Sequence, residues 1–189
     1  MTQTLSDHTI AILATEGVEH SELDKPRQAL IDAGATVELV SLDTEPFRAF
    51  DSLDPRNEEQ PDVAVADADV SRYDGLLLPG GVANPDKLRQ DDDAVAFVRG
   101  FFAAGKPVSA ICHAPWLLIE AGVLEGRTVT SFPSLKTDLQ NAGATWVDEE
   151  VHVDAGLTTS RNPGDIPAFI SKSIEEFAEG KHRAQKRSV

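Results

Sequence analysis

The chain has 189 residues, 41% of them hydrophobic, which is enough for one folded domain with a core. Acidic side chains outnumber basic ones by 32 to 17, so the formal net charge is −15. Phosphate backbones and anionic lipid would repel so acidic a chain, so the composition argues against nucleic acid and membrane partners.

The compartment is predicted from cysteine usage and hydropathy. Cys112 is the one cysteine, which excludes a disulfide within the chain and fits a reducing compartment. No apolar run approaches the ~18 residues that a membrane span needs. Residues 1–8 are predicted as a polar N-terminal tail without the order of a signal peptide. We therefore expect a cytoplasmic protein.

The first elements follow the pattern of a βαβ unit. Thr9 to Ala14 is an apolar run and is predicted as a strand. A helix is predicted to follow, with Asp24 as its N-cap and Pro26 in its first turn, and to run to Ala33 before Gly34.

The middle of the chain contains one polar stretch between two predicted strands. Residues 36–41 form the second strand, and 75–78 form a central buried strand that ends at Pro79-Gly80-Gly81. The stretch 43–73 contains three prolines and is predicted as a long excursion with one short edge strand at 63–66.

The second half continues the alternation. A helix with an apolar face is predicted to end at Gly105, and residues 107–111 form the next strand, directly before Cys112 and His113. A helix at 114–121 follows. The remaining predicted elements are short ones near 129, 135–142 and 151–159, a helix at 166–179 and a basic tail at 181–189 that frays without a function. The whole predicts one α/β domain over residues 9–180, with a mostly parallel sheet between two helical layers.

Three loops are expected to meet at one edge of this sheet, because ligands of parallel α/β sheets bind beyond the carboxyl ends of the strands. They are Glu16–Glu19, Pro79–Gly81 and Cys112-His113.

Cys112 is predicted to lie on a sharp turn from a strand into a helix. Such an elbow exposes its side chain at the top of the sheet and at a helix N-terminus, which favours the thiolate. The alternative is that Cys112 is a small buried hydrophobe. His113 could accept or donate the thiol proton, or simply fill the elbow. Its backbone N–H and that of Gly81 could form an oxyanion hole, although a plain tight turn also explains the glycines.

Glu19 is the carboxyl group predicted to reach the thiol. The two groups would then titrate as a coupled pair that shares one proton. Glu16 and Glu22 are interpreted as solvated surface charges. The other histidines show no metal-ligand spacing with Cys112, so we expect no metal and no cofactor, and interpret them as structural or surface residues: His8, His20, His152 and His182.

Short motifs along the chain together resemble the ThiJ/PfpI superfamily, from Ile10 to about Phe177. They are Gly17-Val18-Glu19, Leu78-Pro79-Gly80-Gly81, Ala110-Ile111-Cys112-His113-Ala114-Pro115, Ala121-Gly122-Val123-Leu124 and Ser160-Arg161-Asn162-Pro163. The resemblance implies a flavodoxin-like fold of the class I glutamine-amidotransferase type, shared with the parkinsonism-associated deglycase.

The same resemblance assigns roles to residues of this chain. It implies Cys112 as nucleophile, Glu19 as the carboxyl bonded to its sulfur, and backbone oxyanion donors at Gly81 and His113. PfpI-type proteases also use a Glu from a neighbouring subunit to orient the histidine. Asp86 stands at the matching position here, one methylene shorter and one residue displaced.

The function expected from these residues is that of a stress-response enzyme with a cysteine nucleophile, a hydrolase or lyase of glyoxalase or deglycase type. Its partners would be a small reactive carbonyl or a modified protein, and a second copy of the chain in a homodimer or larger homo-oligomer. One alternative is an intracellular cysteine peptidase of the PfpI type. The other is a non-enzymatic redox-sensing or chaperone-like stress protein.

Overall fold

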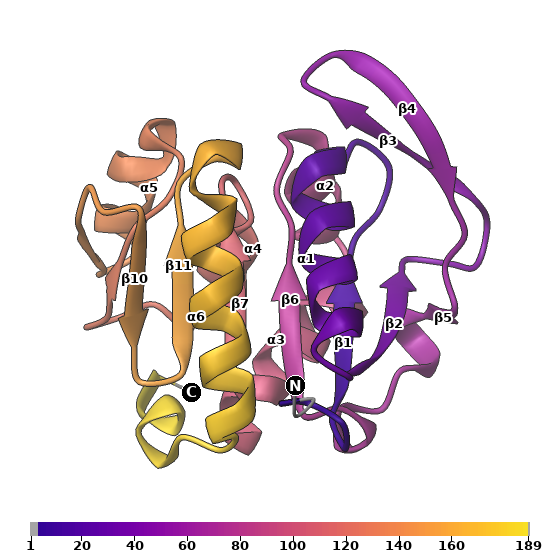
Figure 1. Ribbon diagram of the computed structural model, residues 1–189. Coiled ribbons are helices and arrows are strands. Elements are labelled where there is room, and N and C mark those ends of the chain that lie inside the picture. The colour runs from indigo at the N-terminus through magenta and orange to yellow at the C-terminus, as the bar shows by residue number, and fades with distance from the viewer. Residues whose placement is uncertain (1–3, 189) are drawn as a thin grey trace.

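The computed structural model describes residues 4–188, and its centre is one mixed β-sheet (Figure 1). Within these residues seven strands pair in the order β10-β11-β7-β6-β1-β2-β5, parallel except for β10. Their bounds are β1 Thr9–Leu13, β2 Thr36–Ser41, β5 Val63–Ala64, β6 Gly75–Leu78, β7 Val108–Ile111, β10 Val151–Asp154 and β11 Leu157–Ser160.

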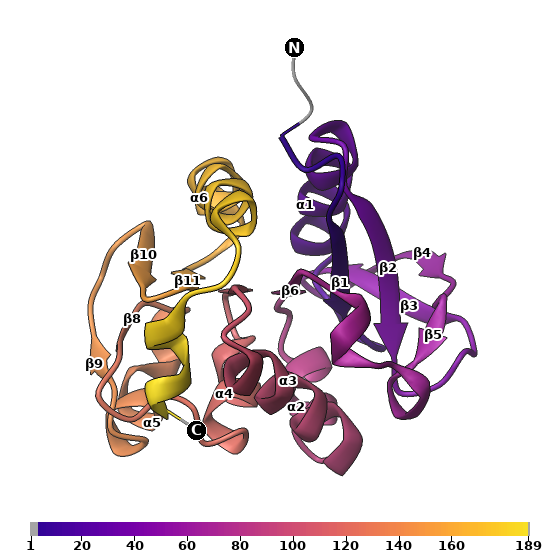
Figure 2. The same ribbon diagram turned by 90° about the horizontal axis from the view of Figure 1, so that it is seen from below.

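Helices cover both faces of the sheet and complete three layers (Figures 1 and 2). Helices α1 (His20–Asp32) and α6 (Ile166–Glu179) lie side by side on one face. The other face is covered by α2 (Ala83–Leu88), α3 (Asp92–Ala104) and α4 (Pro115–Glu120), with α5 (Lys136–Asn141) near the β10 edge. The α/β class and the mostly parallel sheet are thus confirmed.

Each face of the sheet buries its own hydrophobic cluster. In β6, Leu76 and Leu78 point into the cluster under α3 and α4, while Leu77 points into the cluster under α1 and α6. Neighbouring side chains of a strand point to opposite faces, so a central strand between two helical layers is apolar throughout. This explains the short unbroken apolar runs of the sequence.

The start of α1 differs from its prediction. The helix begins at His20 with Glu19 in extended backbone before it, so Asp24 is not the N-cap and Pro26 lies inside the helix. Leu23, Pro26 and Leu30 are buried along one face of α1. Packing of this face against the sheet outweighs the helix-breaking tendency of the proline.

The excursion after β2 contains a hairpin that the sequence did not reveal. Strands β3 (Phe47–Asp51) and β4 (Asp54–Glu59) pair antiparallel, and the predicted edge strand is β5. The sequence of β4, Asp-Pro-Arg-Asn-Glu-Glu, shows no apolar alternation because nearly all of it is exposed. In Figure 1 this hairpin extends beyond the sheet at the end where β6 points.

The remaining segments are short. Strands β8 (Thr128–Val129) and β9 (Thr145–Trp146) form a separate pair, and the element predicted at 151–159 is the hairpin of β10 and β11. Single 3-10 turns occur at Val65–Asp67, Val70–Arg72, Pro133–Leu135 and Pro163–Asp165. The expected frayed tail is instead a 3-10 helix, η5 (Arg183–Ser188), whose Gln185 is buried and accepts a hydrogen bond from Arg127. Within residues 4–188, no helix has the length and apolarity that crossing a membrane requires.

Candidate active site

Cys112 occupies the turn between β7 and α4 with a strained backbone. Its φ of 64° lies in the left-handed region, which costs a non-glycine residue about 1–3 kcal/mol and is typical of functional sites. Two backbone hydrogen bonds hold this conformation: the Cys112 N–H donates to Ser160 (3.0 Å), and its carbonyl accepts from Phe132 (2.9 Å). The predicted elbow is therefore present.

Four groups surround the sulfur, which belongs to a side chain only 7% exposed. The Nδ1 atom of His113 lies 3.2 Å from Sγ. The backbone N–H groups of Gly81 and His113 and the carboxyl group of Glu22 are close enough to the sulfur to shift its pKa. The two N–H groups predicted as oxyanion donors thus converge on the sulfur.

The carboxyl group beside the thiol is Glu22 and not Glu19, so the predicted contact was wrong. Glu22 is fully buried in the first turn of α1, and its Oε2 also accepts the Gly80 N–H at 2.9 Å. Glu19 lies one helical turn earlier, where its Oε2 accepts the Ser52 N–H at 3.0 Å and its Oε1 accepts from Ser21. The interpretation of Glu22 as a solvated surface charge was also wrong.

Burial dominates the electrostatics of this pair. It raises the pKa of Glu22 to about 8, although the N–H of Gly80 opposes the shift. Burial and the charge of an ionised Glu22 raise the pKa of the Cys112 thiol, while the N–H groups of Gly81 and His113 lower it. The expected depression of the thiol pKa is therefore not found. The thiol and the carboxyl group form a coupled acid pair.

His113 is held by aromatic rings. Its imidazole stacks on Phe132 with 4.6 Å between ring centroids and meets the edge of Trp116 at 5.2 Å. Its Nε2 lies 3.3 Å from Ser134 Oγ. Burial lowers the pKa of His113. The imidazole is thus favoured in its neutral form beside the thiol.

Asp86 lines the same pocket but has a different partner. Its Oδ1 accepts hydrogen bonds from Nη2 (2.7 Å) and Nε (3.0 Å) of Arg89, one turn along α2. Within residues 4–188 no hydrogen bond joins Asp86 to His113. The chain alone therefore contains no Cys-His-Asp triad in its described part.

Two glycines allow the loop after β6 to approach the thiol. A Cβ on Gly80 would lie 2.6 Å from the Cβ of Cys112 and 2.5 Å from Oε2 of Glu22. Gly81 has a φ of 81° and packs against the backbone of Gly17. Side chains at these positions would separate the three loops, so the glycines are needed for the site as well as for the turn.

These loops enclose a pocket of about 690 Å³ with Cys112 at its base. The hairpin β3–β4 contributes Phe50, Ser52 and Leu53, which the sequence did not identify as site residues. The lining combines acidic and apolar side chains: Glu19, Glu22, Asp86, Phe50, Leu53, Val82, Phe132 and Pro163.

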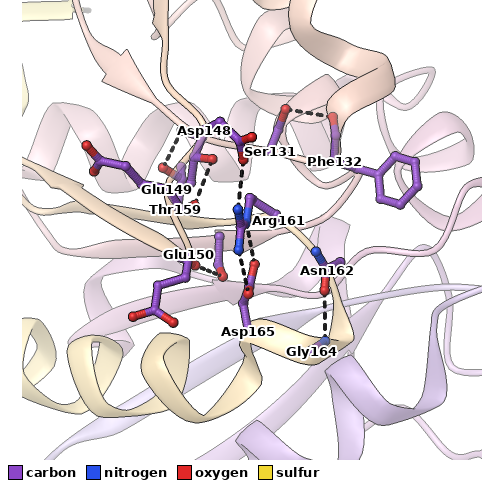
Figure 3. Close-up of polar contacts among 12 residues, drawn as sticks. Ser131, Phe132, Asp148, Glu149, Glu150, Thr159, Arg161, Asn162, Gly164 and Asp165 are labelled. Atoms are coloured by element: carbon purple, nitrogen blue, oxygen red, sulfur yellow. Dashed lines mark hydrogen bonds and ion pairs between the residues drawn. The ribbon is translucent and has the colours of Figure 1, made fainter.

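The segment after β11 is fixed by an ion-pair network (Figure 3). Arg161 binds Asp165 through Nε (2.8 Å) and Nη2 (3.0 Å), and binds Asp148 through Nη1 (2.7 Å). The Asn162 side chain accepts the Gly164 N–H at 2.9 Å. Because Pro163 lies within this segment and lines the pocket, the network positions one pocket wall.

A model of the DJ-1/PfpI family matches residues 8–176. The chain belongs to this family. It is 42% identical over 166 residues to general stress protein 18 of Bacillus subtilis, a match that covers 87% of this chain and 95% of that protein. It is 40% identical over 166 residues to protein/nucleic acid deglycase 2 of Escherichia coli, with the same coverage.

Solved structures of the DJ-1/PfpI family agree with the fold. The crystal structure of Drosophila melanogaster DJ-1beta superposes with a TM-score of 0.83 at 30% identity, over 90% of each chain. The resemblance to the ThiJ/PfpI superfamily is confirmed, and with it the flavodoxin-like fold. The named relatives support an enzyme of this family that is related to stress.

Proposed function

We propose that the chain is a cysteine-dependent enzyme that acts on reactive carbonyl compounds or on their adducts with proteins. The observation that carries the proposal is the buried thiol of Cys112, which is surrounded by two N–H donors, one imidazole and one protonatable carboxyl group at the base of a pocket. The deglycase name of the Escherichia coli relative supports the same reaction class.

The first chemical step would be attack of Sγ on the aldehyde carbon of a compound such as methylglyoxal. A carbon–sulfur bond forms, and the carbonyl electron pair becomes an alkoxide, giving a hemithioacetal. The N–H groups of Gly81 and His113, which already face the sulfur, would stabilise this oxyanion. Their fixed backbone positions mean that little reorganisation accompanies the charge.

Proton transfer would complete the cycle. The thiol proton passes to a neighbouring base, Nδ1 of His113 or an ionised Glu22, as Sγ attacks. A proton then moves from the former aldehyde carbon to its neighbour, which gives a thioester. Water hydrolyses the thioester to a 2-hydroxy acid and the free thiol, so the net change is addition of one water. Glu19 precedes α1 and bonds to Ser52 at the pocket, so it would contact the substrate and not the sulfur.

Exposed apolar side chains at the mouth of the pocket support the proposed homodimer. Leu53 is 90% exposed, and Val82 and Phe132 are also exposed at the rim of the same pocket. A second copy of the chain would cover these apolar side chains. Asp86 lies on this rim and would reach a partner's site only by leaving Arg89, which argues against strong peptidase activity. A cytoplasmic location, where the thiol stays reduced, belongs to the same proposal.

The test compares the full chain with Cys112→Ser on methylglyoxal and on unfolded casein. The expected result is formation of a 2-hydroxy acid from methylglyoxal by the native chain, loss of it in Cys112→Ser, and little casein cleavage. Casein cleavage that requires Cys112 and falls in Asp86→Ala would favour the peptidase. No turnover of either substrate, with a stoichiometric gain in mass on peroxide treatment, would favour the redox sensor.

A further inference from the structure

A second cluster of potential ligands lies at the end of the sheet opposite Cys112. Glu176 and Glu179 come from the last turn of α6, and His182 follows two residues after Gly180. Their ligand atoms all lie within 4.8 Å of one another. In Figure 1 the lower end of α6 and the yellow C-terminal segment lie beside the turn between β10 and β11, whereas Cys112 follows the other end of β7.

Two of these atoms are buried and lack hydrogen bonds. Glu176 is only 7% exposed, and within the described part of the chain neither its Oε2 nor Nε2 of His182 has a hydrogen-bond partner. The two atoms face each other at 3.2 Å, close enough for an ion pair if the imidazole is protonated. Two ligands that bind one Zn²⁺ at about 2.0–2.1 Å in tetrahedral geometry are also separated by roughly 3.3 Å. The spacing therefore fits a shared metal ion.

The backbone holds His182 in this position. Gly180, with a φ of 79°, ends α6 and turns the chain back toward Glu176. The His182 N–H then donates to the carbonyl of Gly105 at 2.8 Å. Gly156 packs so closely against the imidazole that a Cβ there would lie 2.8 Å from its Cδ2. The ring is thus fixed before any ligand binds, which favours metal binding.

The charge of the helix end also favours a cation. The last turn of α6 carries Glu175, Glu176 and Glu179 and, in this described helix, no basic residue. This places negative charge at the negative end of the helix dipole, the opposite of the stabilising arrangement. Glu175 is paired with Lys172 at 2.6 Å, which leaves the other two carboxylates for His182. A divalent cation would offset the repulsion between these two carboxylates and the dipole.

We propose that Glu176, Glu179 and His182 bind a divalent transition metal, with Zn²⁺ as the best match to two carboxylate oxygens and one imidazole nitrogen. Three protein ligands leave at least one coordination position for water. The match to the DJ-1/PfpI family ends at residue 176, so two of the three ligands lie outside it. The site therefore stands apart from the proposed carbonyl chemistry. The metal would pin the segment after α6 to the last turn of that helix.

Zn²⁺ binding to the full chain tests this assignment. The measurements use a Cys112→Ser background, because the thiol is itself a zinc ligand. Isothermal titration with ZnCl₂ should show one ion per chain. His182→Gln and Glu179→Gln should each weaken binding by at least about tenfold, because replacing even a residue that only orients a metal ligand typically costs about 10–100-fold in affinity. Glu175→Gln is the matched control, because it removes a charge from the same turn outside the cluster, and its affinity should change by less than about threefold.

A second readout separates binding at the cluster from binding elsewhere. Zn²⁺ should raise the melting temperature of the background and of Glu175→Gln, and should slow tryptic cleavage after Lys181 and Arg183. Neither effect should appear in His182→Gln or Glu179→Gln. Glu179 is exposed, so its replacement leaves the fold intact. Absence of stoichiometric binding, or equal affinity in the two variants and the control, would show that Glu176 and His182 form an ion pair only.

Discussion

Replacing Glu22 with glutamine should stabilise the protein, and the gain should grow as the pH rises. Burial raises the pKa of Glu22 from 4.5 to about 8, so the folded chain keeps a proton that the unfolded chain has lost. The stability of the native protein therefore falls as the pH rises between these two values. At pH 7 the loss is about 3 kcal/mol, since each pKa unit is worth about 1.4 kcal/mol. Glutamine can make both contacts of the protonated carboxyl group, with the Gly80 N–H and the Cys112 sulfur, but has no proton to lose.

Urea unfolding at pH 5, 6, 7 and 8 measures this effect. The difference in unfolding free energy between Glu22→Gln and the native chain should increase by up to about 1.4 kcal/mol per pH unit. Glu19→Gln is the matched control, because it makes the same change in a neighbouring glutamate that lines the pocket and bonds to Ser52. A difference for Glu22→Gln that does not change with pH would refute the reasoning, because it would mean that Glu22 ionises in the folded protein as it does in the unfolded chain.

Three further predictions concern the thiol, the glycine loop and the core. Because the pKa of the Cys112 thiol is raised, iodoacetamide should modify it slowly at neutral pH and faster as the pH increases. Mass spectrometry should show one adduct per chain, and a modification rate already at its plateau at pH 7 would contradict the prediction. Gly80→Ala should lower the unfolding free energy by about 1–3 kcal/mol and slow the same alkylation, because its Cβ would collide with the Cβ of Cys112. Phe101→Ala should cost about 3–5 kcal/mol in urea unfolding, because this buried ring packs edge-on against Phe97 at 5.1 Å; a loss below about 1 kcal/mol would show a loosely packed core.

The parallel sheet could be predicted because helices bury both of its faces. The central strand β6 lies between two helical layers, so its run at residues 75–78 is apolar throughout, and Pro79 follows it. The last helix was located at Ile166–Glu179 because its apolar face repeats with the helical period and Gly180 follows. Topology then placed Cys112, Gly81 and His113 together without knowledge of any side-chain contact.

The hairpin β3–β4 could not be predicted in the same way. Strand β4 is exposed except at Glu59, so its sequence lacks the alternation that marks a half-buried strand. Strand β3 buries Phe47 and Ala49 on either side of exposed Arg48, but three alternating positions inside a polar stretch are too few to predict a strand. The hairpin is also held by backbone pairing and by contacts that join distant parts of the chain. The Gly17 N–H donates to the Arg48 carbonyl, and the Phe50 N–H donates to the Val18 carbonyl. Such pairs leave no local pattern, which is why Phe50 and Leu53 were not identified as pocket residues.

The choice of Glu19 over Glu22 followed from the wrong start of α1. A helix that starts after Asp24 leaves the carboxyl groups of Glu19 and Glu22 in a loop. Glu19 is then the natural candidate, because it belongs to the Gly17-Val18-Glu19 motif. With the helix starting at His20, Glu22 lies in the first turn, and its side chain points back toward the helix N-terminus, where Gly80 and Cys112 lie. The buried Leu23, Pro26 and Leu30 place this face of α1 against the sheet. The helical spacing from Glu22 to Pro26 and Leu30 puts the Glu22 carboxyl group on the same buried face, so it cannot be a solvated surface charge. That spacing was the signal in the sequence that identifies Glu22.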